Sequence, residues 1–428
     1  MIEKFFQLKK NNTTIRTEIR AGITTFLAMV YIVPVNASIM SSSGMPFDAL
    51  ISATALVTII ATLLNAFWSN TPIAISVGMG LNAYFTFGLV KGMHIPWQSA
   101  LGIVMISGLI FLLLSLTKFR VWVLDSVDIN IKRAISAGIG LFIAFIGFQG
   151  MGLIIANKST LVSLGDISSP KVLLGIFGFL TAAFFYMKKI KGGFLYSIIL
   201  TTVAAWVFGY IQLPKHFFSF PASIEPIAFK FDITSVLKLS LLPVIITFLI
   251  TDMFDTVGTL AGVGLRAKLI EQKNDKLQKT LEADALATVI GASLGTSTTT
   301  SFIESAAGVE EGGKTGLTST VTALLFISTL FFLPIFKIIP SSAIYAILVM
   351  VGVLMFSEIK NIDLNDPVIL ISSFLTITLM PLTYSITLGL CSGFLVYFLL
   401  ALLQKDKNKI NVGSFILALI GFLGLYIN

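Results

Sequence analysis

Apolar segments of helical length recur along almost the whole chain, separated by short stretches that carry glycine, proline or charge. Hydrophobic residues make up 56% of the sequence and charged residues only 12%. A soluble domain carries about 25% charged residues and has no means of hiding so many apolar segments from water. The sequence therefore predicts an all-α polytopic membrane protein whose partner along most of its surface is the lipid bilayer.

The apolar segments predict fourteen membrane spans, several of them shorter than the ~20 residues that a straight transmembrane helix needs. With the N-terminus inside, 22 of the 29 Lys and Arg residues fall in inner segments, which agrees with the positive-inside rule. We therefore expect a multi-pass protein of the cell (inner) membrane with both termini cytoplasmic. The predicted spans are residues 21–43, 48–68, 72–90, 99–117, 134–155, 171–187, 193–211, 240–264, 281–295, 296–310, 316–338, 341–357, 367–385 and 387–403.

The two halves of the chain resemble each other. Residues 170–181 and residues 367–376 both begin with a proline, and each is followed by a second apolar run. Seven spans per half is an odd number, so the halves insert with opposite orientations. The pattern predicts the 7+7 inverted repeat that is typical of secondary transporters. The apolar stretch 414–427 is too short to cross a bilayer and predicts an interfacial or packed helix.

The third and tenth spans are interrupted in the same way. Residues 71–85 contain a β-branched stretch followed by Gly78 and Gly80, and residues 295–308 begin with a run of Thr and Ser. Both patterns predict a short strand followed by a half-helix. Such backbone is tolerated at membrane depth only where it is buried in protein or lines a cavity, so these segments mark the expected binding site. Close helix packing would explain the two glycines equally well.

Three acids lie at membrane depth with no basic residue near them in the sequence. Asp252 and Asp255 share one helix face in the apolar stretch 240–264, and Glu304 lies in the tenth span. An unpaired charge in hydrocarbon is expensive, so such acids indicate function. Burial and mutual repulsion favour the neutral form of at least one aspartate, which suits a group that binds and releases protons. Alternatively, the helix end dips into water and its acids are solvated.

Other polar groups of these segments suit a flat ligand. Asn82 supplies an amide, while Tyr84 and Phe85 supply aromatic faces. Together with Glu304 they suit a neutral ring that donates N–H groups.

Four further acids are predicted to be structural or solvated. Glu282 and Asp284 are expected in the first turn of the ninth span, where acids favour a helix N-terminus. Glu310 and Glu311 are expected in an inner loop beside Lys314.

Several longer motifs carry a resemblance to a known family. They are residues 25–32 (TFLAMVYI), 78–85 (GMGLNAYF), 254–260 (FDTVGTL), 282–287 (EADALA), 295–309 (GTSTTTSFIESAAGV) and 380–385 (MPLTYS). In these motifs the chain resembles the AzgA-like purine permeases of the nucleobase–cation symporter (nucleobase–ascorbate transporter) family. The resemblance extends over nearly the whole length of the chain. The resemblance implies proton-coupled uptake of adenine, guanine or hypoxanthine, usually by a homodimer, with sodium coupling not excluded.

The resemblance also implies how the chain is divided. A core domain (residues 21–117 and 240–338) would carry the site, a gate domain (131–211 and 341–403) would move against it, and residues 404–428 would form a cytoplasmic or interfacial tail. The candidate substrate-binding residues are Glu304, Asp255, Asn82, Gly80, Tyr84, Phe302 and Ser305. The candidate proton-coupling residues are Asp252, Asp255 and Glu304.

Competing functions can be ordered by the same residues. A uracil or xanthine symporter of the same fold is the nearest alternative. An anion carrier fits less well, since it should place a basic or neutral residue where Glu304 stands. An intramembrane aspartyl protease needs two aspartates on facing helices, whereas Asp252 and Asp255 lie on one. A single cysteine and two histidines exclude a disulfide and a Cys- or His-rich metal site, no cofactor is expected, and the net charge of +8 is no sign of nucleic-acid binding.

Overall fold

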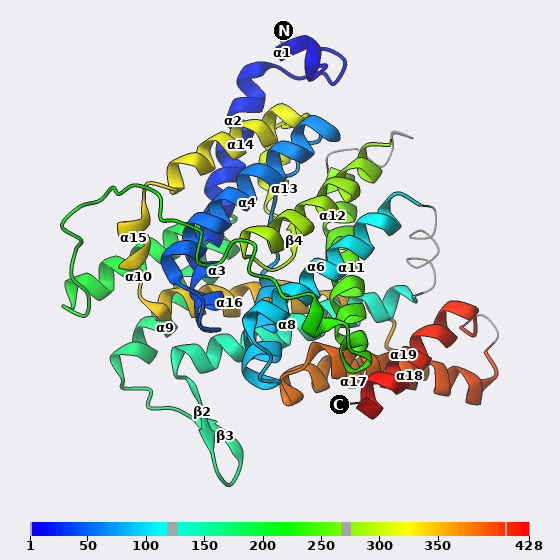
Figure 1. Cartoon of the computed structure of the whole chain (residues 1–428). Coiled ribbons are helices and arrows are strands. Elements are labelled where there is room, and N and C mark those ends of the chain that lie inside the picture. The colour runs from blue at the N-terminus through cyan, green and yellow to red at the C-terminus, as the bar shows by residue number, and fades with distance from the viewer. Residues whose placement is uncertain (1, 118–126, 267–274, 407–408, 428) are drawn as a thin grey trace.

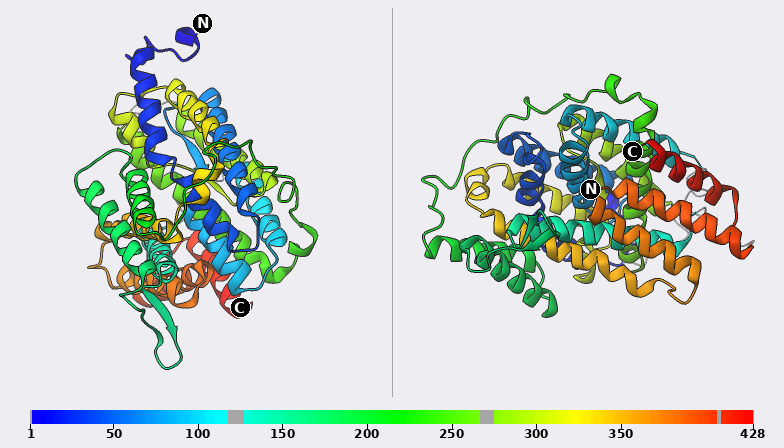
Figure 2. Two further views of the ribbon diagram at one scale, coloured as in Figure 1. Left: turned by 90° about the vertical axis from the view of Figure 1, so that its left-hand side faces the viewer. Right: turned by 90° about the horizontal axis from the view of Figure 1, so that it is seen from below.

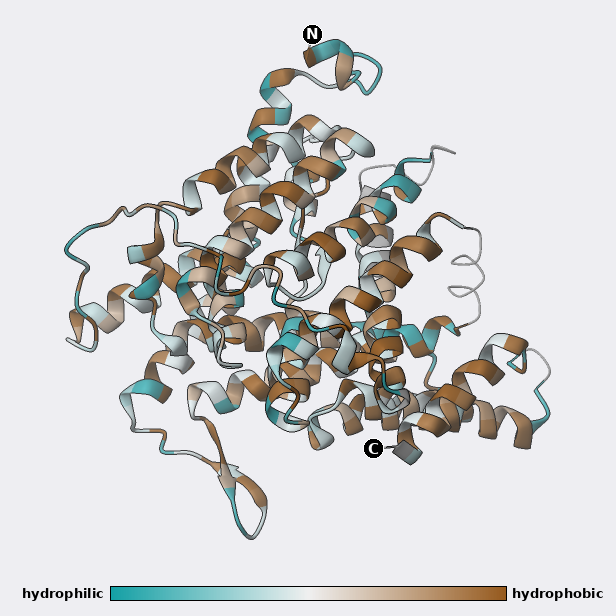
Figure 3. Cartoon of the chain, viewed as in Figure 1, coloured by the Kyte–Doolittle hydropathy of each residue, from teal (hydrophilic) through white to brown (hydrophobic). Residues whose placement is uncertain are grey.

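The computed structural model describes residues 2–117, 127–266, 275–406 and 409–427. Within these ranges, seven helices are long and apolar enough to cross a membrane, and several shorter apolar helices accompany them. Apolar residues dominate the helices, while polar residues gather in the connecting segments (Figure 3). The chain is therefore a multi-pass membrane protein, as its composition predicts.

The first half of the chain is built from helices with one short strand, β1, and one strand pair, β2–β3, between them. Its elements are α1 (Ile2–Phe5), α2 (Ile15–Met29), α3 (Ile32–Ser41), α4 (Phe47–Trp68), β1 (Ile75–Val77), α5 (Met79–Ala83), the π-helical η1 (Tyr84–Gly92), α6 (Trp97–Ser115), α8 (Ile129–Met151), β2 (Ile154–Asn157), β3 (Leu161–Leu164), α9 (Pro170–Met187) and α10 (Gly193–Val207).

The second half repeats this plan. Its elements are the short turns η2 (Thr234–Val236) and η3 (Leu239–Leu241), then α11 (Leu242–Arg266), α12 (Lys276–Leu294), β4 (Thr299–Ser301), α13 (Ser305–Glu310), α14 (Gly316–Thr329), α15 (Leu333–Lys337), α16 (Ser341–Phe356), η4 (Ser357–Asn361), α17 (Pro367–Thr383), α18 (Ile386–Gln404) and α19 (Val412–Ile427).

The helices pack into two groups, and each group takes elements from both halves. In the strand-bearing group, α4 packs on α14 and α12, α2 packs on α14 and α13, and α6 packs on α11 and α12. In the flanking group, α8 packs on α16 and α17, α9 on α10 and α16, and α17 on α18 (Figure 1). The β2–β3 hairpin projects from the flanking group at the end opposite the N-terminus (Figure 2).

The inverted repeat is visible in matching elements. α9 and α17 both begin with a proline, at Pro170 and Pro367, whose missing N–H costs nothing in a first turn. Each has a capping side chain just before it, Ser169 or Asp366. β1 and β4 hold the same position in the two halves, and each is followed by a short helix, α5 or α13. The 7+7 architecture and the interrupted spans predicted from the sequence are confirmed.

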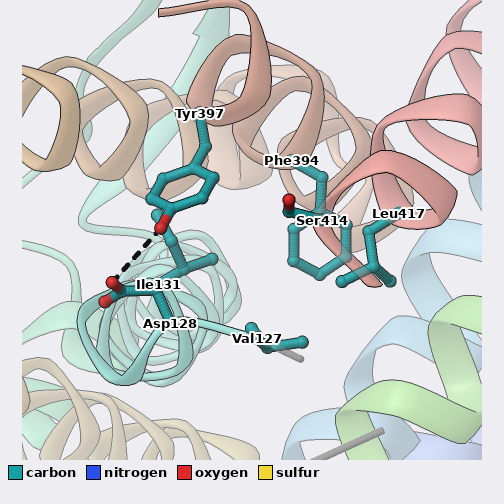
Figure 4. A pocket seen from close by; sticks show the side chains of 7 residues that line it. All are labelled: Val127, Asp128, Ile131, Phe394, Tyr397, Ser414 and Leu417. Atoms are coloured by element: carbon teal, nitrogen blue, oxygen red, sulfur yellow. Dashed lines mark hydrogen bonds between the residues drawn. The ribbon is translucent and has the colours of Figure 1, made fainter. Parts of the chain in front are cut away.

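The C-terminal helix α19 packs against α18 and α11. A Cβ at Gly421 or Gly424 would lie 2.5 or 2.6 Å from the Cys391 carbonyl oxygen or sulfur, so these glycines permit the close approach. A small cavity lies where α18 and α19 meet the start of α8 (Figure 4). There the Tyr397 hydroxyl donates to Asp128 over 3.3 Å, and none of the predicted site residues lines the cavity.

Candidate functional site

Two short strands meet at the centre of the strand-bearing group. β1 and β4 pair antiparallel, with Ile75 opposite Ser301 and Val77 opposite Thr299. Two more backbone bonds extend the pair, from Gly78 N to Thr298 O and from Phe302 N to Ala74 O, each of 2.9 Å. The extended backbone predicted for both spans is therefore satisfied by pairing between the two halves of the chain.

Each strand has a second edge, and one threonine satisfies each edge. The Thr62 hydroxyl of α4 accepts from Ile75 N (3.1 Å) and donates to Ile75 O (2.9 Å). In the other half, Thr288 of α12 accepts from Thr299 N (3.1 Å) and lies 3.3 Å from Thr299 O. A hydroxyl both donates and accepts, so a single side chain can pair the N–H and the C=O of one residue. Unpaired peptide groups at this depth would be costly.

Glu304 lies directly before α13 and faces the first half of the chain. Its carboxylate accepts a 2.6 Å hydrogen bond from the Tyr31 hydroxyl. Tyr31 is fully buried and lies at the break between α2 and α3. The break follows from Pro34, which has no N–H to donate to the carbonyl four residues earlier and whose ring crowds it. The Tyr31 ring meets Phe194 of α10 edge to face, with centroids 5.3 Å apart.

Three further acids, all aspartates, lie close to strand β4. Asp255 lies beside the Thr300 hydroxyl and is close enough to Glu304 for electrostatic interaction. Asp284 accepts from the Thr256 hydroxyl. Asp252, buried with 2% of its surface exposed, accepts from Thr288 over 3.2 Å. Across the described ranges, no Lys, Arg or His forms an ion pair with any of these four acids.

The expectation for Glu282 and Asp284 is wrong in position. α12 begins at Lys276, about two turns earlier, because the polar residues before the apolar segment are good helix formers that extend the helix beyond the bilayer core. Glu282 accepts from the Trp68 indole N–H over 3.0 Å and from Gln278. Asp284 is fully buried and interacts electrostatically with Asp252 and Asp255. It belongs to the acid cluster and not to a helix terminus.

The predicted substrate-binding residues from the first half lie around α5. The Asn82 amide donates to Asn36 of α3, and its own carbonyl oxygen has no partner among the described residues. The Tyr84 hydroxyl shares a 2.6 Å hydrogen bond with Thr387 of α18. A Cβ at Gly80 would lie 2.8 Å from the Ile139 side chain of α8, so this glycine permits close packing between the two helix groups.

The predicted residues from the second half have mixed surroundings. Phe302 is buried, and its backbone N–H extends the strand pair. The Ser305 hydroxyl accepts from Ala74 N over 3.0 Å and so fastens α13 to the segment before β1. Asp255 and Glu304 are partly accessible, unlike Asp252 and Asp284. Asn82 and Tyr84 therefore lie at the contact between the two helix groups, because α5 packs on α8 and α11 and Tyr84 bonds to Thr387, while Ser305 is already occupied.

Sequence reasoning missed three members of this region, namely Tyr31, Asn36 and Asp284. The signals were present for the first two, since a proline and an asparagine interrupt an otherwise apolar first span. No such signal marks Asp284, because hydropathy indicates where the bilayer begins and not where a helix begins.

The family model described as "Permease family" matches residues 16–404. A putative permease of Methanocaldococcus jannaschii is 42% identical, with 98% of this chain and 97% of the relative covered. Adenine permease AdeP of Escherichia coli is 37% identical (93% and 89% covered), and guanine/hypoxanthine permease PbuO of Bacillus subtilis is 38% identical (99% and 100%).

The chain belongs to this permease family. It is thus a transport protein and not an enzyme, and the aspartyl protease hypothesis falls. The match ends with the last residue of α18, so α19 lies outside it.

Solved structures show the fold of this permease at low sequence identity. The transmembrane domain of a cyanobacterium bicarbonate transporter, BicA, matches with a TM-score of 0.60 and 15% identity, with 96% of each chain covered. The murine Solute Carrier 26 family member A9 anion transporter matches with a TM-score of 0.65 and 11% identity, covering 91% of this chain and 69% of that one. At such identities the likeness concerns the fold alone.

Proposed function

We propose that this permease takes up purine nucleobases (adenine, guanine or hypoxanthine) across the cell (inner) membrane and couples their uptake to protons. Full-length relatives named as adenine and as guanine/hypoxanthine permeases support the substrate class. The arrangement of the acids supports the manner of binding and the coupling.

The observation that carries the proposal is the environment of Glu304. Its carboxylate lies at the contact between the two helix groups, with a tyrosine hydroxyl as its partner and no cation paired with it in the described ranges. A carboxylate there can accept hydrogen bonds from the N–H groups of a neutral heterocycle. The amide oxygen of Asn82 adds an acceptor without a partner among the described residues, and the Tyr84 ring, stacked on Phe248 with centroids 5.5 Å apart, is the aromatic group expected at the site.

The aspartates suit proton binding for a separate reason. Asp252 Oδ1 and Asp284 Oδ1 have no hydrogen-bond partner among the described residues, although both side chains are buried. A buried carboxylate oxygen without a partner is stabilised when a proton binds to it. We assign ligand contact to Asp255, which interacts with Glu304, and coupling to Asp252, which lies deeper beside Asp284.

Transport requires the site to open alternately to each side. We assign the core domain expected from the sequence to the strand-bearing group and the gate domain to the flanking group. We propose that the core domain moves against the gate domain in a homodimer whose termini are cytoplasmic. A ligand drives such a change only through different affinities for the two states.

The test is uptake of radiolabelled adenine, guanine, hypoxanthine, uracil and xanthine by cells that lack their own nucleobase permeases and express this chain. We expect purine uptake that collapses when a protonophore dissipates the proton gradient and persists without sodium. Uptake of uracil or xanthine alone would replace the substrate class, and a strict sodium requirement would replace the coupling ion.

A further inference from the structure

We propose that Tyr31 is an internal competitor for the ligand, because its hydroxyl occupies in the empty protein the carboxylate oxygen of Glu304 that a base N–H takes over. The inference rests on the proposed function and deepens it. It assigns to Tyr31 the role of setting ligand affinity and release, which the acids alone do not explain.

The geometry supports competition at one atom. The Tyr31 hydroxyl lies 2.6 Å from Glu304 Oε1, a distance typical of a strong O–H···O bond. Glu304 receives no hydrogen bond from any other described side chain. The bond therefore satisfies Oε1 while the site is empty, and the competition consists in a ligand N–H taking the lone-pair position that the Tyr31 hydroxyl holds.

The position of Tyr31 makes the displacement feasible. The residue lies where α2 ends and α3 begins, at a kink that Pro34 enforces and where the helix lacks a regular backbone bond. Its ring is held at the other side by edge-to-face contact with Phe194 of α10, with an interplanar angle of 89°. The hydroxyl can leave Glu304 by a small rotation of this segment while the ring keeps its contact with the flanking group.

The competition predicts an unusual direction for a mutation in a binding site. Breaking the Tyr31–Glu304 bond is part of the cost of binding, so removing the hydroxyl leaves the empty carboxylate unsatisfied and favours the bound state. Tyr31→Phe should therefore bind base more tightly, by roughly five- to tenfold. A tyrosine that merely oriented Glu304 for the ligand would give the opposite result, since its loss would weaken binding.

The experiment measures equilibrium binding of radiolabelled hypoxanthine, guanine and adenine to the purified full-length protein in lipid nanodiscs. The variants are wild type, Tyr31→Phe, Glu304→Gln and the double variant. Tyr397→Phe is the matched control, because it also removes a buried tyrosine hydroxyl that donates to a carboxylate, that of Asp128, at the contact of α18 with α8 and away from the predicted site residues. Proteoliposome uptake on the same variants gives KM and the maximal rate.

We expect Tyr31→Phe to lower Kd and KM together and to lower the maximal rate, because release becomes slower. The gain should fall below about twofold in the Glu304→Gln background, where the neutral amide oxygen is a weaker acceptor for the hydroxyl. Tyr397→Phe should show no tightening. Base binding to the wild type should also change the tyrosine signals in a UV resonance Raman difference spectrum, and Tyr31→Phe should remove that change.

Weaker binding by Tyr31→Phe, or a gain that persists in the Glu304→Gln background, would overturn the inference and leave the proposed function standing. If Tyr31→Phe fails to fold, a wild-type difference spectrum without any tyrosine change on ligand binding would overturn it as well. Wild-type protein that binds no purine would overturn both the inference and the proposed function.

Discussion

The two halves of the permease support their strands with the same backbone device but with different chemistry. In the first half, β1 is supported from α4 by neutral groups: Thr58 bonds to Ser76, Thr62 to Ile75 and Asn65 to Ile73 O. In the second half, β4 is supported from α12 by Thr288, with Asp284 one turn before it. The halves therefore share the solution to an architectural problem and differ in charge.

The difference in charge separates residues that support the strands from residues proposed to bind ligand and protons. Unpaired peptide groups at membrane depth must be satisfied in either half, and a hydroxyl does so without charge. All four carboxyls of the cluster, Asp252, Asp255, Asp284 and Glu304, come from the second half. The three aspartates have threonines of the second half as hydrogen-bond partners, while Glu304 has the Tyr31 hydroxyl of the first half. An inverted repeat can thus keep its frame symmetric while only one half carries the titratable groups.

The largest expected effect is at Glu304. Glu304→Gln should abolish purine uptake or reduce it severely while the protein still reaches the membrane. The loss of one charge-assisted bond to the base costs about 1.5–3 kcal/mol, which is tenfold or more in affinity. Binding and uptake are measured beside Glu310→Gln, an exposed acid at the end of α13 that should behave as wild type. Unchanged affinity in Glu304→Gln would remove this acid from the site.

The next effect is on coupling. Asn mimics a protonated aspartic acid in size but cannot titrate, so replacing the coupling aspartate should uncouple exchange from accumulation. Asp252→Asn should still exchange labelled for unlabelled base across a proteoliposome membrane, but should not concentrate base under an inward proton gradient. Asp255→Asn should mainly weaken binding. If both variants still accumulate base in response to the gradient, the pair is not the coupling site.

A smaller effect is expected at Thr62 and Thr288, the two threonines that bond to the outer edges of β1 and β4. Thr62→Val leaves the N–H and C=O of Ile75 without their side-chain partner, and Thr288→Val does the same for the N–H of Thr299. Each loss should cost about 1–3 kcal/mol of stability and lower Tm. The Thr288 hydroxyl has a single proton, which it can donate to Asp252 in place of Thr299 O, so only Thr288→Val should in addition alter proton-driven accumulation. Equal transport defects in the two variants would show that the chemical difference between the halves has no consequence here.

The smallest effect is expected at Glu311, an acid of the second half that pairs with Lys191 and Arg20 outside the membrane core. The hydrogen bond and charge of Lys191 hold the pKa of Glu311 below its usual range. A lowered folded-state pKa gives stability that is present above the unfolded pKa and lost as pH falls through the folded value. Lys191→Ala should hardly change Tm at neutral pH, because exposed ion pairs contribute little, and the difference should vanish in acid.

Much of this protein follows from one-dimensional patterns. Hydropathy and the distribution of Lys and Arg predict a polytopic membrane protein, and the Thr- and Gly-rich interruptions at 71–85 and 295–308 predict strands and half-helices. The acids Asp252, Asp255 and Glu304 are conspicuous because charge is rare in apolar sequence. The place of Asp284 in the acid cluster was not predicted, because α12 begins before its apolar segment. The acid therefore lies further inside the helix than hydropathy suggests.

The order of residues along the chain is therefore enough to locate the apolar segments and the local form of their backbone, because the bilayer acts on every segment separately. Tertiary packing decides which groups meet. Tyr31 and Glu304 are separated by 273 positions, and Thr299 faces Val77 only because two halves of opposite orientation interlock. Contacts between distant segments depend on how the helices pack around the paired strands β1 and β4. That packing is a property of the whole chain and not of either segment.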